Sequence, residues 1–175
     1  MTDETGQHHT SNGSLEVRKL AAPARIELQQ LASIFDDYRA HYGEVADAQQ
    51  TASWLAENIG SGRLEAFVAE DDGELVGFAT TTAVPASLRL GRFWQIRDLF
   101  VVPGRRRLGV GRALLDRVRA AAISAGATRL VLQTEVDNTP ALRLYAESGY
   151  TTIDGYCTLS LSLQPDRPRY EEEIR

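Results

Sequence analysis

The strongest constraint on the fold is an apolar segment that leads through a glycine-rich loop directly into a helical pattern. Residues 93–102, FWQIRDLFVV, have the aromatic and β-branched composition of a strand. The loop GRRRLGVGR occupies residues 104–112, and apolar residues then recur at the spacing of one helix face, namely Val110, Leu114, Val118, Ala121 and Ala125. A strand joined to a helix in this way is typical of an α/β sheet.

The segments on either side of this unit complete the predicted sheet. Residues 64–70 and 74–84 are predicted to form a hairpin around the turn Asp71-Asp72-Gly73. Downstream we expect a strand at 128–136, a helix at 138–148 and a last strand at 156–163, and two strands joined by one helix run parallel. With helices expected at 24–42 and 48–59, the chain is predicted to be an α/β protein whose mixed sheet begins with antiparallel strands.

Length and composition favour one ordinary globular domain. The chain has 175 residues, and we expect a disordered N-terminal tail at 1–14, a single domain at 15–163 and a loose C-terminal tail at 164–175. The start of the chain is neither basic nor apolar, no apolar run reaches about 18 residues, and Cys157 is the only cysteine. These features predict a cytoplasmic protein with no membrane partner.

The glycine-rich loop has the features of an anion site. A strand that ends in such a loop before a helix directs several free backbone N–H groups at one point, with the positive end of the helix behind them. Gly109 and Gly111 remove side chains where a phosphate would approach, and the arginines at 105–107 and 112 can add charged hydrogen bonds. The predicted guest is a pyrophosphate.

Other phosphate-binding and nucleic-acid-binding patterns fit less well. A P-loop requires Lys-Ser or Lys-Thr after its second glycine, where this chain has Val110-Gly111. A dinucleotide fingerprint requires glycine or alanine at position 114, which is leucine. A nucleic-acid-binding domain that uses the arginine loop stays an alternative, but the formal net charge of −5 opposes it, and we expect no nucleic-acid partner.

Three segments together resemble the GNAT superfamily of N-acetyltransferases. They are LFVVP at 99–103, RRLGVG at 106–111 and DNTPALRLYAESGY at 137–150, and the resemblance extends over about residues 93–150. It implies the GNAT acyl-CoA N-acyltransferase fold, with a splayed parallel pair in the centre of the sheet and helices on both faces. It also implies acetyl-CoA as co-substrate, no metal, and direct transfer of the acetyl group to an amine of a small molecule or protein.

The resemblance further implies which residues hold the co-substrate. Leu99, Phe100 and Val101 would bind the pantetheine arm and the acetyl carbonyl, the glycine loop would wrap the pyrophosphate, and Asn138 would contact the pantetheine. Tyr145 would lie near the sulfur and is our general acid. The residues assigned to co-substrate binding are Leu99, Phe100, Val101, Arg106, Arg107, Leu108, Gly109, Val110, Gly111, Arg112 and Asn138.

The general base is the least constrained role, because an amine attacks a thioester only after losing its proton. In some family members a glutamate five residues before the motif asparagine serves, but here that position is Gln133. Asp98 and Glu135 are the candidates. Asp98 is favoured because a carboxylate on the apolar strand face of Ile96 and Phe100 is costly unless it is paired. An ion pair of Asp98 with an arginine such as Arg89, and a water relay without a single base, stay open.

Each site residue also has a purely structural interpretation. Asn138 before Thr139-Pro140 is a good helix N-cap, and Tyr145 can simply fill the core. The aromatic residues Tyr38, Tyr42, Trp54 and Trp94 border either the acceptor cleft or the core. Cys157 is an improbable nucleophile, since His41 is the only histidine of the predicted domain.

The main alternative to an enzyme is a domain that binds acetyl-CoA without turnover. Because Gln133 replaces the glutamate that serves as base in some family members, the chain could instead be a catalytically silent acetyl-CoA sensor or a partner-docking domain. The acceptor pocket is expected from the first two helices, their connection at 42–50 and the loop at 85–92, none of which carries a motif. The last strand offers an edge through which a homodimer could form.

Overall fold

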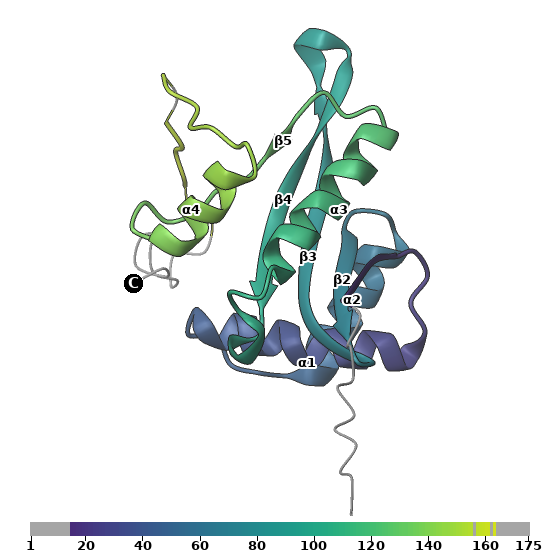
Figure 1. Cartoon of the computed structure of the whole chain (residues 1–175). Helices are drawn as coiled ribbons and strands as arrows, with labels where there is room; N and C mark the ends of the chain where they lie inside the picture. Colours follow the sequence, from purple (N-terminus) through teal and green to yellow (C-terminus); the bar gives the residue numbers. More distant parts are fainter. Residues whose placement is uncertain (1–14, 156, 162, 164–175) are drawn as a thin grey trace, which may run out of the picture.

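The computed structural model describes residues 15–155, 157–161 and 163. Figure 1 shows one sheet with helices packed against it. The strands are β1 (Glu16–Leu20), β2 (Glu65–Asp71), β3 (Glu74–Ala86), β4 (Gly91–Val101) and β5 (Leu130–Val131), and the helices are α1 (Arg25–His41), α2 (Ala48–Gly60), α3 (Val110–Ser124) and α4 (Thr139–Glu147). The strand order is β1-β2-β3-β4-β5, antiparallel throughout except for the parallel pair β4–β5.

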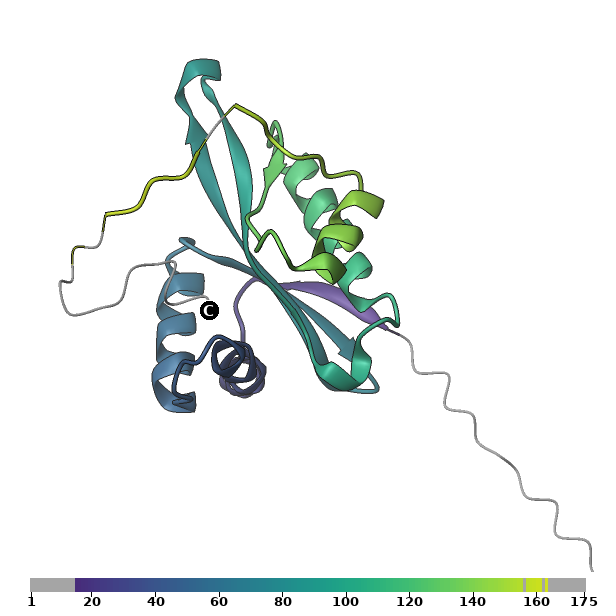
Figure 2. The same ribbon diagram turned by 90° about the vertical axis from the view of Figure 1, so that its left-hand side faces the viewer.

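The sheet separates two cores. Residues of α1 and α2 pack on one face, with Phe78 and Phe100 of the sheet beneath them. The helix α3 covers the other face over Phe67, Trp94 and Ile96. Figure 2 shows α1 and α2 on one side of the strands and α3 and α4 on the other. The expected mixed α/β fold with helices on both faces is therefore confirmed.

The predicted helices and the first hairpin are confirmed with small shifts of their ends. At the β2–β3 turn Asp72 and Gly73 have φ values of 52° and 80°, the left-handed pair that a two-residue hairpin turn requires. β3 and β4 extend further than expected. Pro85 pairs with Arg92 and Ala86 with Gly91, so half of the predicted loop at 85–92 belongs to a two-stranded ribbon, and the turn is confined to residues 87–90.

Two features at the sheet edges differ from the sequence-based expectation. The strand β1 was not predicted, because its sequence EVRKL has no clear alternation, and it forms by pairing with β2 from Glu16↔Glu70 to Leu20↔Ala66. Arg18 supports it through ion pairs with Glu27 at 2.8 Å and Glu70 at 3.4 Å. Pairing with β2 therefore stabilises a strand that the local sequence of β1 does not predict.

The C-terminal part of the predicted sheet is shorter than expected. Only two residues of the strand predicted at 128–136 pair with β4, which leaves β5 at the edge of the described sheet, so the parallel pair is not central. Of the strand predicted at 156–163, residues 157–161 and 163 have no regular secondary structure, while 156 and 162 lie outside the described residues. Its alternating leucines are exposed, Leu159 at 90% and Leu161 at 83%, because no strand edge pairs with them.

The predicted tails at 1–14 and 164–175 lie outside the described residues. Within the part of the chain that is described, no helix is both long enough and apolar enough to cross a membrane.

Candidate active site

The loop between β4 and α3 holds a row of free main-chain donors. Arg107 and Gly109 adopt left-handed conformations, with φ values of 65° and 86°. The first bond of the helix runs from the Ala113 N–H to the Gly109 carbonyl, and among the described residues no N–H group from 107 to 112 donates to a main-chain acceptor. Free N–H groups at the positive end of a helix have the geometry that anion binding requires, and the pyrophosphate site predicted from the sequence stays a prediction.

Several arginine side chains of the loop already contact other residues of this chain. Arg105 forms an ion pair of 2.9 Å with Asp71 in the β2–β3 turn. The Arg106 Nε donates to the Val101 carbonyl at 3.0 Å, and its guanidinium lies 5.7 Å from the centre of the Phe100 ring. Arg112 is 3.3 Å from Glu147 of α4. Because these arginines have partners, the main chain supplies most of the free donors of this loop. The side chains of Arg107 and Leu108 are exposed.

Glycine is required at positions 109 and 111 for different structural reasons. Gly109 is left-handed, and a Cβ placed there would meet no heavy atom within 4 Å. A Cβ on Gly111 would lie 3.1 Å from the Leu144 Cδ2, so Gly111 allows α4 to pack closely on α3. The sequence explained both glycines by phosphate approach, and for Gly111 that explanation omitted the contact with α4.

The strands β4 and β5 separate soon after they meet. They pair only at Trp94↔Leu130 and Gln95↔Val131, while β4 continues to Val101. Figure 1 shows the segment after β5 and α4 leaning away from β4. Residues 99–101 pair with β3 on their other side, which leaves the side facing β5 open. The splayed pair that the resemblance implies is thus present, with Leu99, Phe100 and Val101 along its opening.

A β-bulge sets the direction of Asp98. Thr80 pairs with Asp98 but Thr81 pairs with Ile96, so Arg97 is an extra residue in β4. A bulge reverses the alternation of side chains. Ile96 accordingly packs on the α3 side and Phe100 on the α1 side, and the expectation that both share a face with Asp98 is wrong for Ile96.

Asp98 is bound by neutral hydroxyl groups. The Thr80 Oγ1 donates to its Oδ2, and the Tyr38 hydroxyl of α1 is among the groups that lower its pKa. Among the described residues it forms no ion pair, so the expected alternative of a pair with Arg89 is wrong. Burial raises the pKa of Asp98, and the hydrogen bonds from Thr80 and Tyr38 and the charge of Arg97 offset only part of this rise.

Glu135 lies in a more polar setting after β5. The Thr134 Oγ1 and the Asn138 Nδ2 approach its Oε2 at 3.3 Å and 3.2 Å. Burial raises the pKa of Glu135, but hydrogen bonds from its own backbone, Asn138, Tyr42 and Thr134 outweigh it, and the net pKa is lowered. The Asn138 Oδ1 accepts from the Ala141 N–H at 3.2 Å, so the N-cap interpretation of Asn138 is confirmed.

Tyr145 is half-buried on α4 between the core and the carboxylates. Its ring packs on the α3 side and lies 5.9 Å from the Tyr150 ring. Burial and then the charge of Glu135 raise the pKa of the Tyr145 hydroxyl. The packing expected of a core residue is therefore present, together with a hydroxyl close enough to Glu135 to sense its charge.

The hydroxyl of Tyr42 of α1 is affected by the charges of all three candidate catalytic residues. Burial, the charge and hydrogen bond of Glu135, and the proximity of Tyr145 and Asp98 raise the pKa of Tyr42 to about 12. The sequence named Tyr38 and Tyr42 only as residues of a cleft or core. The signal for a closer role was their spacing of four, which places both on one face of α1.

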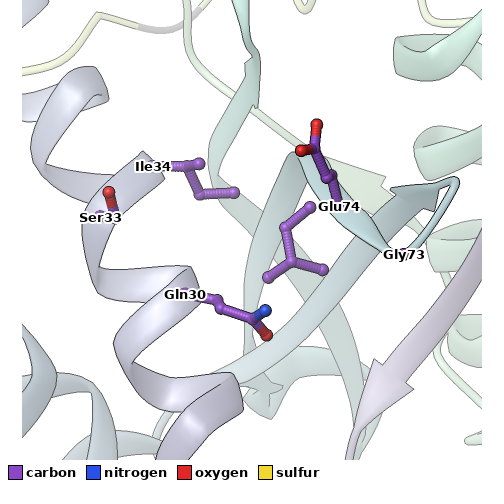
Figure 3. Close-up of a pocket in the computed structure, with 6 residues that line it drawn as sticks. Gln30, Ser33, Ile34, Gly73 and Glu74 are labelled. Atoms are coloured by element: carbon purple, nitrogen blue, oxygen red, sulfur yellow. The ribbon is translucent and has the colours of Figure 1, made fainter.

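Several other features of the sequence fall outside this cluster. Trp94 is buried in the core, and Trp54 is 47% exposed beside Phe35. The described residues contain no group of three or more histidine, cysteine, aspartate or glutamate side chains that could hold a metal ion. A hollow of about 220 Å³ between α1 and the β2–β3 turn (Figure 3) shares no residue with the cluster, and its lining is Gln30, Ser33, Ile34, Gly73, Glu74 and Leu75.

The fold and the site together define the class of protein. The chain belongs to the acetyltransferase (GNAT) family, whose profile matches residues 28–150. It is 32% identical to the uncharacterized N-acetyltransferase YhfO of Bacillus subtilis over 76% of this chain and 89% of that protein.

Solved structures agree with this assignment. A probable acetyltransferase superposes with a TM-score of 0.78 at 25% identity, over 85% of this chain and 98% of that one. The aminoglycoside N-acetyltransferase AAC(6')-Iy, solved in complex with CoA, superposes with a TM-score of 0.71 at 16% identity, over 87% of this chain and 97% of that one. This second likeness shows the shared fold alone. The general reaction of the family is transfer of an acetyl group to an amine.

Proposed function

We propose that this protein is an acetyl-CoA-dependent N-acetyltransferase that transfers the acetyl group directly to a primary amine of a small molecule or a protein. The observation that carries the proposal is the opening between β4 and β5, whose pairing ends at Gln95↔Val131, together with the free amides of residues 107–112 in the loop that follows β4. Membership of the family supplies the reaction class.

The co-substrate fits the two parts of this opening. The free N–H groups of residues 107–112 would hold the diphosphate, with Arg106, Arg107 and Arg112 at its rim. The unpaired side of β4 at Leu99, Phe100 and Val101 would hydrogen-bond the pantetheine arm. The Asn138 Oδ1 accepts from the Ala141 N–H and one N–H of its Nδ2 donates to Glu135, so the second N–H of Nδ2 would contact the arm.

The chemistry follows from the protonation states of the two carboxylates. Asp98 has a raised pKa and would take the proton from the acceptor ammonium. The free amine then attacks the thioester carbonyl carbon, the carbon–sulfur bond breaks, and Tyr145 would donate its proton to the leaving thiolate. The attacking nitrogen loses its second proton as the amide forms, and this proton, carried by water, would restore the Tyr145 hydroxyl. Main-chain N–H groups on the open side of β4 would stabilise the oxyanion of the tetrahedral intermediate.

Glu135 is assigned a different role from Asp98. Its pKa is lowered, so it stays ionised and is the poorer proton acceptor of the two. Among the described residues no lysine or arginine forms an ion pair with it. A permanent negative charge beside the opening would attract the cationic acceptor. The position that the sequence singled out, Gln133, contacts Thr158 at 3.3 Å and has no part in the proposed proton transfer.

The test is release of free CoA in the presence of defined amines. Spermidine, kanamycin and a peptide with a free N-terminal alanine sample polyamine, aminoglycoside and protein acceptors, the second because a protein of the same fold is an aminoglycoside N-acetyltransferase. The exposed thiol of Cys157 reacts with thiol reagents, so a blank with protein alone is required. Calorimetry with acetyl-CoA runs in parallel. Binding without CoA release on any amine would indicate the silent sensor, and no binding would contradict the proposal.

A further inference from the structure

The paired ends of β3 and β4 form a ribbon that projects from the domain. Figures 1 and 2 show this ribbon, residues 82–95, extending beyond the helices, and its pairing ends at Ala86↔Gly91. At its tip Leu88 is 101% exposed and Leu90 is 95% exposed. Apolar side chains that gather at one place on a surface mark a contact site more often than scattered ones do.

The ribbon adds an apolar strip on the α1 side of the sheet. Side chains alternate along β3, so Val84 lies on the same face as Phe78, which packs under α1 and α2. Phe93 pairs with Val84 and shares that face. Neither Val84 nor Phe93 belongs to the two cores of the described residues, and the Arg129 guanidinium lies 4.7 Å from the centre of the Phe93 ring. The apolar surface therefore continues from the tip toward the domain, with a cation beside it.

Positive charge surrounds this apolar surface. Residues 82–97 contain Arg89, Arg92 and Arg97 and no aspartate or glutamate. Within the part of the chain that is described, none of these arginines forms an ion pair. Because like charges repel, two ribbons do not pack on each other favourably, and a surface that covers the tip needs carboxylates. The formal net charge of −5 makes the rest of this chain a source of such a surface.

The hollow beside the β2–β3 turn has the complementary chemistry. Ile34 and Leu75 give it an apolar lining (Figure 3). Glu74 lines it as well, Asp72 lies in the adjoining turn, and both of these side chains are exposed. Among the described residues neither carboxylate forms an ion pair. The volume of about 220 Å³ exceeds the ~150 Å³ of a protein cavity that holds benzene, so a leucine side chain fits.

We propose that the ribbon tip of one copy of this chain occupies the hollow of a second copy. Glu74 is the first residue of β3 and Ala86 is the last, so the hollow and the tip lie at opposite ends of one 13-residue strand, roughly 40 Å apart. Two copies whose β3 strands run antiparallel therefore place each tip at the hollow of the other. The contact occurs twice about a two-fold axis, which closes the assembly as a dimer.

Each part of the tip has a counterpart in the hollow. The leucine side chains enter the apolar part, while Arg89 and Arg92 approach Glu74 and Asp72. The apolar contact provides affinity, and the charges fix the register of the two copies. These ion pairs lie at the rim of the contact, where salt screens them. The inference goes beyond the proposed function and does not depend on acetyl transfer, so the failure of one leaves the other intact.

Sedimentation velocity of the full chain over a range of concentrations tests the dimer. We expect wild-type protein to form a concentration-dependent dimer that weakens as salt is added. Arg89→Glu and Glu74→Arg each bring like charges together at both contacts, so we expect each to raise the Kd of the dimer roughly 100-fold or more. Arg119→Glu is the matched control, because it reverses an exposed arginine of α3 on the other face of the sheet and should leave the Kd unchanged.

A mixture of Arg89→Glu with Glu74→Arg gives the sharpest result. In a mixed dimer the reversed tip of one variant faces the reversed hollow of the other, and the second contact is unaltered. We expect the mixture to dimerise with nearly the affinity of wild-type protein, although each variant alone is far weaker. Both substitutions are at exposed positions, so we expect an unchanged Tm, which shows that each variant is folded.

Four results would overturn the inference. Wild-type protein could be a monomer at every concentration, or a monomer whose tip binds vesicles of anionic lipid. The two variants could each dimerise as tightly as wild-type protein, which would place the interface elsewhere, such as on the last predicted strand. The fourth result is a mixture of folded variants that does not recover the dimer.

Discussion

The substitution Gly109→Ala tests the glycine loop most directly. Gly109 begins α3 with a φ of 86°, a conformation that an L-residue with a side chain adopts only under strain. The strain of one left-handed residue is ~1–2 kcal/mol. For a chain of this size that destabilisation corresponds to a fall in Tm of roughly 2–8 °C. A new methyl group would meet no protein atom within 4 Å, so the fold itself has room for it.

The effect on the co-substrate is expected to be larger than the effect on folding. The methyl group would project from a residue within the row of free N–H groups, where a diphosphate needs close approach to the main chain. Loss of one charge-assisted hydrogen bond there weakens binding by roughly 10–100-fold. Calorimetric titration with acetyl-CoA, performed well below the reduced Tm, measures this loss.

Gly104→Ala is the matched control for this prediction. Gly104 lies in the same loop, a Cβ there also meets no atom within 4 Å, and its φ is not in the left-handed region. We expect the control to retain both its Tm and its affinity for acetyl-CoA. If Gly109→Ala bound acetyl-CoA as tightly as the control while folding normally, the loop would not be the diphosphate site, and the roles given to Asn138 and Tyr145 would lose their basis.

Substitutions at three further positions separate catalysis from stability. Asp98→Asn removes the proposed base and is expected to lower kcat by roughly 10²-fold or more, with acetyl-CoA affinity unchanged by calorimetry. Tyr145→Phe keeps the packed ring and removes the proposed acid, so we expect a kcat loss of similar order and an unchanged Tm. Asn138→Ala removes the cap of α4 and should destabilise the protein by ~1 kcal/mol in urea unfolding, whereas Asn138→Ser, which keeps a capping oxygen, should retain most of that stability.

Local patterns were sufficient to predict the elements that carry their own signals. The helices α1, α2 and α3 have one apolar face each, and the turn at Asp72 and Gly73 contains the residues that its left-handed angles require. The loop before α3 was predictable for the same reason, since its glycines lie between a strong strand and a strong helix. In these segments local sequence and tertiary structure favour the same conformation.

Features that depend on a distant partner could not be predicted in this way. The strand β1 exists because the edge of β2 accepts it, and β5 ends after two residues because the chain then leaves β4. The cap at Asn138 was predictable from its neighbours, but its bond to Glu135 required the turn after β5. The hydrogen bond from Thr80 to Asp98 joins residues 18 positions apart in the sequence numbering, next to a bulge that no local pattern marks.

The bulge also decides which carboxylate can serve as a base. In the sequence Asp98 and Glu135 are both candidates, and Asp98 is favoured only by its place on an apolar strand face. The extra residue Arg97 turns Asp98 inward to Thr80 and Tyr38, where burial dominates and its pKa rises. Glu135 stands on a turn where four hydrogen bonds outweigh burial and its pKa falls. Opposite shifts of two neighbouring acids allow one to exchange protons while the other stays charged, and this difference arises from backbone geometry rather than from residue type.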